Sequence, residues 1–175
     1  MPGALFLEGE KVNLRTVEKE DLEFLRDTYN LEQVRKFVGN RHPANLKQEQ
    51  EFFEGVVCKE ESTDLIICSE EEPIGMISVI PDNKDIQVAE IGLWLHPDHH
   101  GNGYGTEASK LIIEHAFNER NFHKLFARVY SSNEPSQRLW EKLEFTKEGE
   151  LREQVYKDGE FENVYLYGIL KTEWF

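Results

Sequence analysis

Polar and hydrophobic positions alternate in several short stretches of the chain. This alternation is typical of strands that bury one face. The predicted strands lie around Val12, Leu14 and Thr16 and over residues 64–69, 73–80 and 86–95. A short acidic turn joins the stretch 64–69 to 73–80, which predicts an antiparallel hairpin, and residues 81–85 are expected to form the next turn. We therefore predict three successive antiparallel strands before residue 96.

Helical spacing occurs between and after these strands. The predicted helices cover residues 18–30 with Thr16 as the cap, residues from Ala44 or Asn45 through Phe53 and Val56, residues 103–119, and part of 131–145. The third helix puts Ala108, Leu111, Ile112, His115 and Ala116 on one stripe. We expect His115 there to be a packed side chain and not a ligand.

The remaining segments complete an α/β pattern. Residues 124–130 predict a strand parallel to 86–95, joined by a right-handed crossover through the third helix. The tail predicts two more strands around a Lys-Asp-Gly-Glu turn at 157–160. Phe37, Phe52 and Phe53 are expected in the core. We find no linker or repeat, so residues 1–175 are predicted to form a single domain with a mixed, mostly antiparallel twisted sheet flanked by helices.

Composition narrows the classes of function. The chain is 39% hydrophobic and 31% charged, which is ordinary for a globular protein. Its net charge of −14 argues against a nucleic-acid partner; it serves solubility, attracts cationic amines, or both. No apolar run is long enough to predict a membrane span, and no signal peptide is indicated. Cys58 and Cys68 do not have the spacing of a metal site or of a disulfide framework. We expect a cytoplasmic protein.

Residues 89–108 (AEIGLWLHPDHHGNGYGTEA) read as an apolar strand, a glycine-rich turn and the start of a helix. Gly101, Gly103 and Gly105 can adopt backbone angles closed to other residues, and the N–H groups of a helix start attract anions. The spacing is not that of a Walker loop, since no Lys follows, nor of a dinucleotide fingerprint, because Thr106 stands where its last Gly would be. A phosphate or pyrophosphate is the expected ligand.

The stretch His100-Gly101-Asn102-Gly103-Tyr104-Gly105 resembles motif A of the GNAT (Gcn5-related) N-acetyltransferases, [QR]-x-x-G-x-[GA]. The continuation through Ala108 is similar to the RimJ/RimL-like branch, which acetylates ribosomal-protein N-termini. Residues 133–145 (NEPSQRLWEKLEF) resemble a second family motif. His100 replaces the usual Gln or Arg, and Glu144 replaces a usual Gly. The resemblance covers nearly the whole chain and implies the GNAT fold.

The resemblance also implies an acetyl-CoA site and direct acetyl transfer to an amine, without a covalent enzyme intermediate. The implied cofactor-binding residues are Leu93, Trp94, Leu95, His100, Gly101, Asn102, Gly103, Tyr104, Gly105, Thr106, Asn133 and Ser136. Main-chain groups of residues 93–95 would pair with the pantetheine arm as an added strand, and the same strand would supply the oxyanion N–H. No metal is expected, because the His96, His99 and His100 cluster lies on no regular element.

Two residues are candidates for the acid–base chemistry. Glu90 aligns with the family's acidic residue at its fourth strand and would act as the general base, with Glu150 and Glu153 as alternatives. The usual proton-donating Tyr is replaced by Trp140, whose indole N–H is not a usable acid. Ser136 matches the RimL-like serine that reaches the CoA sulfur.

Three hypotheses for the function follow, of which two name an amine acceptor. The first, from the RimJ/RimL resemblance, is a protein or peptide N-terminus, whose amine has a pKa of about 8 and needs little help from a base. The second is a small amine such as a polyamine or an antibiotic, favoured if an acidic cluster from residues 27–54 lined the acceptor cleft. The third is an acyl-CoA sensor without catalysis. The expected assembly is a monomer or a homodimer.

Overall fold

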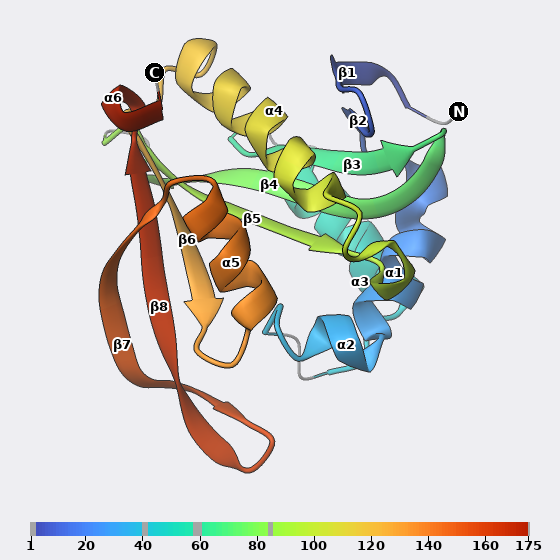
Figure 1. Ribbon diagram of the computed structural model, residues 1–175. Helices are drawn as coiled ribbons and strands as arrows, with labels where there is room; N and C mark the ends of the chain where they lie inside the picture. The colour runs from blue at the N-terminus through green and yellow to red at the C-terminus, as the bar shows by residue number, and fades with distance from the viewer. Residues whose placement is uncertain (1–2, 40–41, 58–60, 84–85, 175) are drawn as a thin grey trace.

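A computed structural model describes residues 3–39, 42–57, 61–83 and 86–174, which build one eight-stranded sheet with helices on both faces (Figure 1). The strands are β1 (Leu5–Glu8), β2 (Asn13–Thr16), β3 (Thr63–Ser69), β4 (Glu72–Asn83), β5 (Val88–Leu95), β6 (Lys124–Tyr130), β7 (Thr146–Lys157) and β8 (Glu160–Leu170). Their order across the sheet is β1-β2-β3-β4-β5-β6-β8-β7, and only β5 and β6 are parallel. The predicted mixed, mostly antiparallel sheet is confirmed.

The helices lie in two groups (Figure 1). They are α1 (Leu22–Asn30), α2 (Glu32–Arg35), α3 (Leu46–Phe52), α4 (Tyr104–Asn118), α5 (Glu134–Lys142) and α6 (Lys171–Trp174), with short turns at Lys19–Asp21, Phe53–Val57 and Pro97–His99. Helices α4 and α5 cover one face of the sheet and α1 and α3 the other. None of the described helices is long and apolar enough to cross a membrane.

The alternation along each strand sorts side chains between these two faces. In β3, Leu65 and Ile67 pack in the larger cluster under α4 and α5, whereas Ile66 and Cys68 pack in the smaller cluster under α1 and α3. Helix α4 contributes its predicted stripe to the larger cluster, where Ala108, Ile112 and Ala116 are fully buried. His115 packs edge-on against the Phe6 ring and lies 3.3 Å from Glu119, as expected of a structural side chain.

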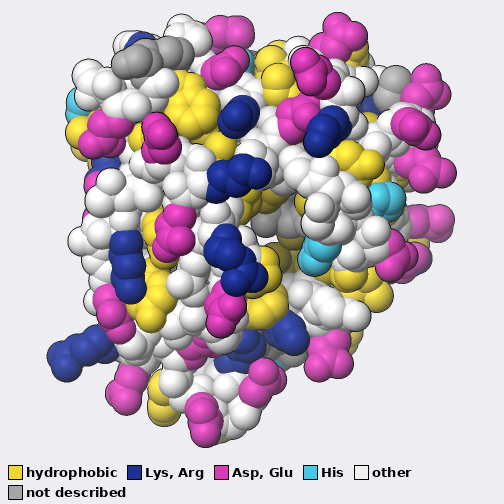
Figure 2. Space-filling view, viewed as in Figure 1, with side chains coloured by type: hydrophobic (Ala, Val, Ile, Leu, Met, Phe, Trp, Pro, Cys, Tyr) yellow, Lys and Arg dark blue, Asp and Glu magenta, His cyan; other side chains and the backbone are white. Residues whose placement is uncertain are grey.

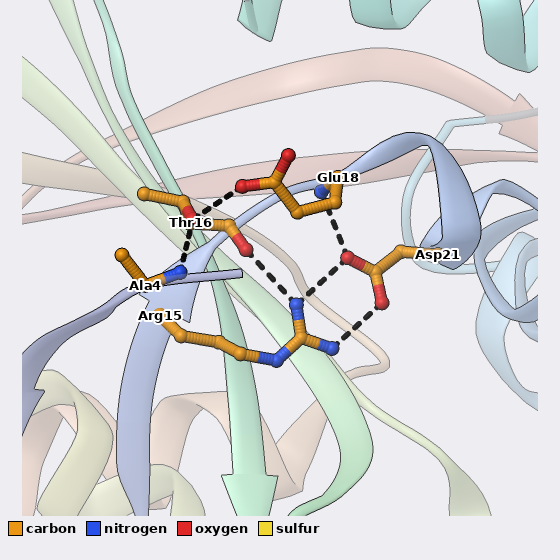
Figure 3. Close-up of polar contacts among 5 residues, drawn as sticks. All are labelled: Ala4, Arg15, Thr16, Glu18 and Asp21. Atoms are coloured by element: carbon orange, nitrogen blue, oxygen red, sulfur yellow. Dashed lines mark hydrogen bonds and ion pairs between the residues drawn. The ribbon is translucent and has the colours of Figure 1, made fainter. Parts of the chain in front are cut away.

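The first helix is attached to the sheet by a buried ion pair (Figure 3). Arg15 on β2 and Asp21 bind each other through two hydrogen bonds of 2.7 and 2.8 Å, and both side chains are almost completely buried. The Asp21 carboxylate also accepts a hydrogen bond from the Glu18 main-chain N–H at 2.9 Å. The prediction that Thr16 caps this helix was therefore wrong: its hydroxyl binds Glu18 and Ala4, because Thr16 ends β2.

The N-terminal third differs in other details from the predicted elements. β1 and α2 were not predicted, since each has only four residues and β1 is largely exposed. The helix after Asn45 does begin there, with Asn45 accepting from the Gln48 N–H at 3.1 Å, but its regular part ends at Phe52 and a π-type turn follows. Cys58 lies outside the described residues, and Cys68 is buried.

β4 runs further than the prediction, which ended it at residue 80. Pro81 pairs with Ala89, and the register shifts between Pro81 and Asn83. A proline lacks the N–H of a regular ladder and is tolerated at such irregularities. Residues 84–85 of the predicted turn lie outside the described residues.

Candidate active site

Strands β5 and β6 pair along only part of their length. The parallel ladder joins Val88, Ala89 and Glu90 to residues 124–126 and has no further pairs, whereas β4 pairs with β5 as far as Leu95. The two strands then diverge (Figure 1). Among the described residues, the main chain of β5 after Glu90 therefore has no strand partner on the β6 side, and this edge can accept an extended ligand by β-addition.

The glycine turn lies at the end of this open edge. Gly101 and Gly103 both have φ of +81°, the left-handed region that favours glycine, and Gly103 is the N-cap of α4. The first intrahelical hydrogen bond runs from the Glu107 N–H to the Gly103 carbonyl, so the amides of the preceding turn have no acceptor within the helix. These amides and the Lys11 ammonium, which lies beside Gly103, suit an anionic ligand.

Gly105, the third glycine, has a different structural role from the one predicted. Gly105 is helical, and a methyl group placed on it would lie 3.3 Å from Leu93 and 3.6 Å from Leu95. Its small size therefore lets α4 approach β5, and no left-handed angle is needed. The expectation of an unusual backbone angle at all three glycines was wrong at this position.

The histidines before the turn make local contacts. The His100 ring nitrogen Nε2 lies 3.0 Å from the Leu95 carbonyl, and the His96 Nδ1 accepts from the Asp98 N–H at 3.3 Å. Asn102 donates to the carbonyls of His99 and His100 and so supports the turn. Within residues 3–39, 42–57, 61–83 and 86–174, no group of His, Cys, Asp or Glu side chains is arranged to hold a metal ion.

A cleft of about 1330 Å³ opens between α5, the glycine turn and the α1–α3 region. Figure 2 shows a hollow on this face with hydrophobic side chains inside it, Lys and Arg on one side and His on the other. Of the predicted cofactor residues, those that line the cleft are Leu93, Trp94, Leu95, His100, Gly101, Gly103, Gly105, Thr106, Asn133 and Ser136. Asn102, which supports the turn, and Tyr104, which begins α4, do not line the cleft.

Glu90 lines the cleft from β5, on the same face of the strand as Trp94 and opposite to α4. Its side chain is 32% exposed and pairs with Arg128 on β6 at 2.5 Å. Burial raises the pKa of Glu90 above its ordinary value; the charge of Arg128 opposes this rise, and that of Asp82 adds to it. Between Glu90 and Trp94, Gly92 leaves open space, because an added methyl group would meet no atom within 4 Å.

Helix α5 presents Asn133, Ser136 and Trp140 to the same cleft. Asn133 is the N-cap and accepts from the Ser136 main-chain N–H at 3.3 Å. One helical turn on, the indole N–H of Trp140 donates to the Ser136 hydroxyl oxygen at 3.2 Å. That bond uses an acceptor position of Ser136, so its own O–H proton is directed elsewhere and can be donated.

The alternative bases lie away from this cleft. Glu150 is exposed on β7 and binds the Asn163 amide, and Glu153 sits at the irregularity in β7 with φ of +50°. Neither lines the cleft. Glu90 is thus the only one of the three candidate bases that does.

Several cleft residues were missed by sequence reasoning. Glu49 on α3 is only 9% exposed, lines the cleft, and has no hydrogen-bond or ion-pair partner among the described residues. Burial raises the pKa of Glu49. Asp64 on β3 also lines it and accepts a hydrogen bond from the Ser78 hydroxyl at 2.5 Å. Only the helical spacing around Asn45 could have hinted at Glu49, since it puts this residue on the face of Phe52.

The aromatic residues of the N-terminal segment divide between core and cleft. Phe53 packs in the cluster under α1 and α3, as predicted. Phe52 does so too and also lines the cleft. Phe37 lines the cleft and belongs to neither core cluster, so its predicted place in the core was wrong.

Comparison with known proteins agrees with this arrangement. The family model "Acetyltransferase (GNAT) domain" matches residues 11–146. The chain is 27% identical over 170 residues to an N-acetyltransferase, p20, of Bacillus licheniformis, covering 94% of this chain and 96% of that protein. It is 24% identical to the spermidine N(1)-acetyltransferase of Escherichia coli K12, covering 89% of this chain and 83% of that protein.

Among solved structures, the spermidine N-acetyltransferase of Vibrio cholerae in complex with CoA and spermine superposes with a TM-score of 0.89. It is 21% identical and covers 95% of this chain and 99% of that one, a likeness that establishes the fold. The narrower resemblance to the RimJ/RimL branch gains no support from these relatives. The family match over most of the chain, the relatives that cover about nine-tenths of it or more and the shared fold lead to one conclusion: the chain belongs to the GNAT family and is an acetyl-CoA-dependent N-acetyltransferase.

Proposed function

We propose that the acceptor is a small aliphatic amine with more than one cationic group, of the polyamine type. The observation that carries this proposal is Glu49, a residue that is nine-tenths buried at the wall of an apolar cleft and whose carboxylate has no partner among the residues that the structure describes. Burying a charge without a partner is costly, and an ammonium group of a ligand would offset that cost. A second cation on the substrate is the group that Glu49 can bind while the reacting amine lies elsewhere in the cleft.

The rest of the cleft fits such a ligand. Its lining is mainly apolar and aromatic, with Asp64 and Glu90 as further carboxylates. Methylene segments between ammonium groups can pack on such a surface, and each ammonium can meet a carboxylate or an aromatic face. The sequence analysis favoured a small amine if an acidic cluster from residues 27–54 lined the cleft. This condition is met only in part, since Glu49 is the one acidic residue of that segment that lines it.

The relatives favour the same acceptor class. Proteins named spermidine N-acetyltransferases, in Escherichia coli and Vibrio cholerae, resemble this chain over most of its length. No relative reported above is named for acetylation of a protein N-terminus. The peptide acceptor expected from the RimJ/RimL resemblance therefore gives way to the small-amine alternative.

Glu90 is the residue we propose as general base. An alkylammonium has a pKa of about 10, so most of the substrate is protonated at neutral pH and must lose a proton before its nitrogen can attack. Glu90 can take this proton directly or through a water molecule. Its raised pKa makes it a stronger base than an ordinary glutamate, because burial disfavours its charged form.

Ser136 is the residue we propose to hydrogen-bond the leaving sulfur. Its hydroxyl accepts from the Trp140 indole, which orients the O–H and makes it a better donor. Trp140 touches no reacting atom in this scheme and acts as a positioning residue. In this scheme, two side chains take over the role of the tyrosine that other family members use. Ser136 donates the hydrogen bond to the sulfur, and Trp140 orients the Ser136 hydroxyl.

The residues of the glycine turn and the open edge of β5 fit acetyl-CoA, which brings the acetyl group as a thioester. The amides at the start of α4 and the nearby Lys11 would hold phosphate groups, and main-chain groups of residues 93–95 would pair with the pantetheine arm. Asn133 at the start of α5 would bind the same arm. These are the anion and β-addition contacts that the ligand's chemistry demands.

The test is release of CoA thiol from acetyl-CoA with spermidine, putrescine, butylamine and N-terminal peptides as acceptors. Putrescine and butylamine share a four-carbon chain, but only putrescine carries a second ammonium. We expect Glu49→Gln to lower kcat/KM about tenfold for putrescine and spermidine, the loss of about 1.4 kcal/mol of binding, with little change for butylamine. Glu51→Gln, an exposed change on the same helix, is the matched control. Turnover of peptides alone, or an equal loss for all amines, would overturn the proposal.

A further inference from the structure

The side chain of Lys157 reaches from the end of β7 to the aromatic wall of the cleft. Its ammonium nitrogen lies 4.3 Å from the centroid of the Phe37 ring and 6.0 Å from that of Tyr130. Both aromatic residues line the cleft. Residues far apart in the sequence, from the segment after α2, from β6 and from β7, thus meet around one ammonium group.

Polar groups complete the surroundings of this ammonium. Lys157 Nζ donates to the Ser132 hydroxyl at 2.8 Å and lies 3.5 Å from the Glu162 carboxylate. The side chains of Lys157 and Glu162 are only 15% and 13% exposed. Burial raises the pKa of Glu162, but hydrogen bonds from Ser132 and Ser131 and the charge of Lys157 outweigh it, so the net pKa lies below the ordinary value and the carboxylate stays ionised.

Two aromatic faces, a carboxylate and a hydroxyl are the groups that recognise an alkylammonium ion. A primary ammonium of the protein itself already holds this position. Lys157, Ser132 and Glu162 line a second, smaller pocket of about 460 Å³. The Lys157 side chain therefore lies between the cleft and this second pocket.

We propose that Lys157 sets the length of amine that the cleft accepts, because its ammonium occupies the position that the far ammonium of a long polyamine would otherwise take. The inference rests on the small-amine function proposed above. A substrate ammonium that reached this wall would meet a like charge, which is unfavourable at close range. Lys36, whose ammonium lies 5.4 Å from the Phe37 centroid, adds to the same repulsion.

The inference predicts a change that depends on substrate length. In Lys157→Met the apolar stem remains but the charge is lost, so the Phe37 ring and the Glu162 carboxylate lose the ammonium beside them and become available to a ligand cation. We expect kcat/KM for spermine to rise about tenfold relative to the wild type, and that for butylamine to change less than about twofold. Putrescine, which is shorter than spermine, should behave as butylamine does.

Two variants serve as controls. Lys157→Arg keeps the positive charge and should retain the wild-type preference. Lys147→Met also removes an ammonium that lies over an aromatic ring, but this ring, Tyr165 of the β7–β8 hairpin, does not line the cleft, so the change should have no effect.

A calorimetric titration with spermine supplies a readout independent of catalysis, and Lys157→Met should bind spermine about tenfold more tightly than the wild type. An equal change for all amines, or unchanged spermine binding in Lys157→Met, would overturn the inference. If the wild type turned over none of the amines, the proposed function itself would fail, which is a separate outcome.

Discussion

At the scale of single residues, Glu90 carries the largest share of the proposed chemistry. Replacing a general base by its amide removes proton acceptance and keeps the shape, so Glu90→Gln should lower kcat about a hundredfold with little effect on the KM for acetyl-CoA. Steady-state kinetics with spermidine measures both constants. An unchanged kcat would remove Glu90 from the mechanism.

The same residue determines a pH dependence whose direction can be worked out. The base must be ionised to accept a proton, so kcat rises with pH through the pKa of Glu90, which burial places above the ordinary glutamate value. Arg128 holds that pKa down, and Arg128→Met should therefore move the rise in kcat to higher pH. A pH profile of both proteins is the measurement, and a shift to lower pH would contradict the assignment.

Trp140 offers a test of the pair on α5. Trp140→Phe removes the N–H that binds Ser136 and should lower kcat about fivefold, the equivalent of one hydrogen bond of about 1 kcal/mol. If the indole acts only through the hydroxyl, the same change should cost nothing further in a Ser136→Ala background. Additive losses in the double variant would show that Trp140 acts by packing alone.

The backbone conformation of Glu144 affects the stability of the fold. It has φ of +65° directly after α5, where the Phe145 N–H donates to the Trp140 carbonyl and the Glu144 N–H to the Glu141 carbonyl, the hydrogen bonds of a Schellman cap. Glycine adopts this backbone without strain, which explains the family preference that the sequence departs from. Glu144→Gly should raise the unfolding free energy by about 1 kcal/mol and Tm by about 2–4 °C in calorimetry. A lower Tm would contradict this account.

The residues of the two family motifs could be identified from the sequence, because each motif is a local pattern with a known spacing. Glu49 and Lys157 could not, since their importance comes from burial and from contacts with distant segments. Lys157 meets Phe37 across 120 positions of the chain, and no local pattern records that contact. The bond between Trp140 and Ser136 follows helical spacing but needs the rotamers of both side chains.

At the scale of elements, the attachment of α1 to β2 depends on the Arg15–Asp21 pair. Asp21→Asn leaves the Arg15 charge buried without its partner, which should lower the unfolding free energy by about 3–5 kcal/mol in urea denaturation. The double variant Arg15→Met/Asp21→Leu removes both charges and should recover much of that loss. An exposed pair, Lys47 and Glu51, is the control, and neutralising Glu51 should cost less than about 0.5 kcal/mol.

Long elements with a strong period were predicted well, and short ones were not. The hairpin of β3 and β4, the strand β5 and the helix α4 all follow from periodic burial. β1 is a short edge strand and α2 is a single helical turn, and both are too short for a hydrophobic period to be recognised. Pro81 ended the predicted β4 because a proline usually breaks a ladder, but here the irregular register accommodates it.

At the scale of the whole molecule, the cleft results from long-range arrangement. β8 lies between β6 and β7, an order that sequence neighbours alone would not predict. The divergence of β5 from β6 after Glu90 creates the open edge. The sequence therefore indicated the fold family and the glycine turn before α4, whereas the side chains proposed for the acceptor could be brought together only by the three-dimensional structure.

The central claim, that this N-acetyltransferase acts on small amines with a second cation, is tested most directly by competition. One reaction would contain acetyl-CoA, spermidine and an N-terminal peptide at equal concentrations, and mass spectrometry would identify which amine carries the acetyl group. We predict that acetylated spermidine dominates and that Glu49→Gln reduces this preference. Acetylated peptide as the main product would contradict the claim.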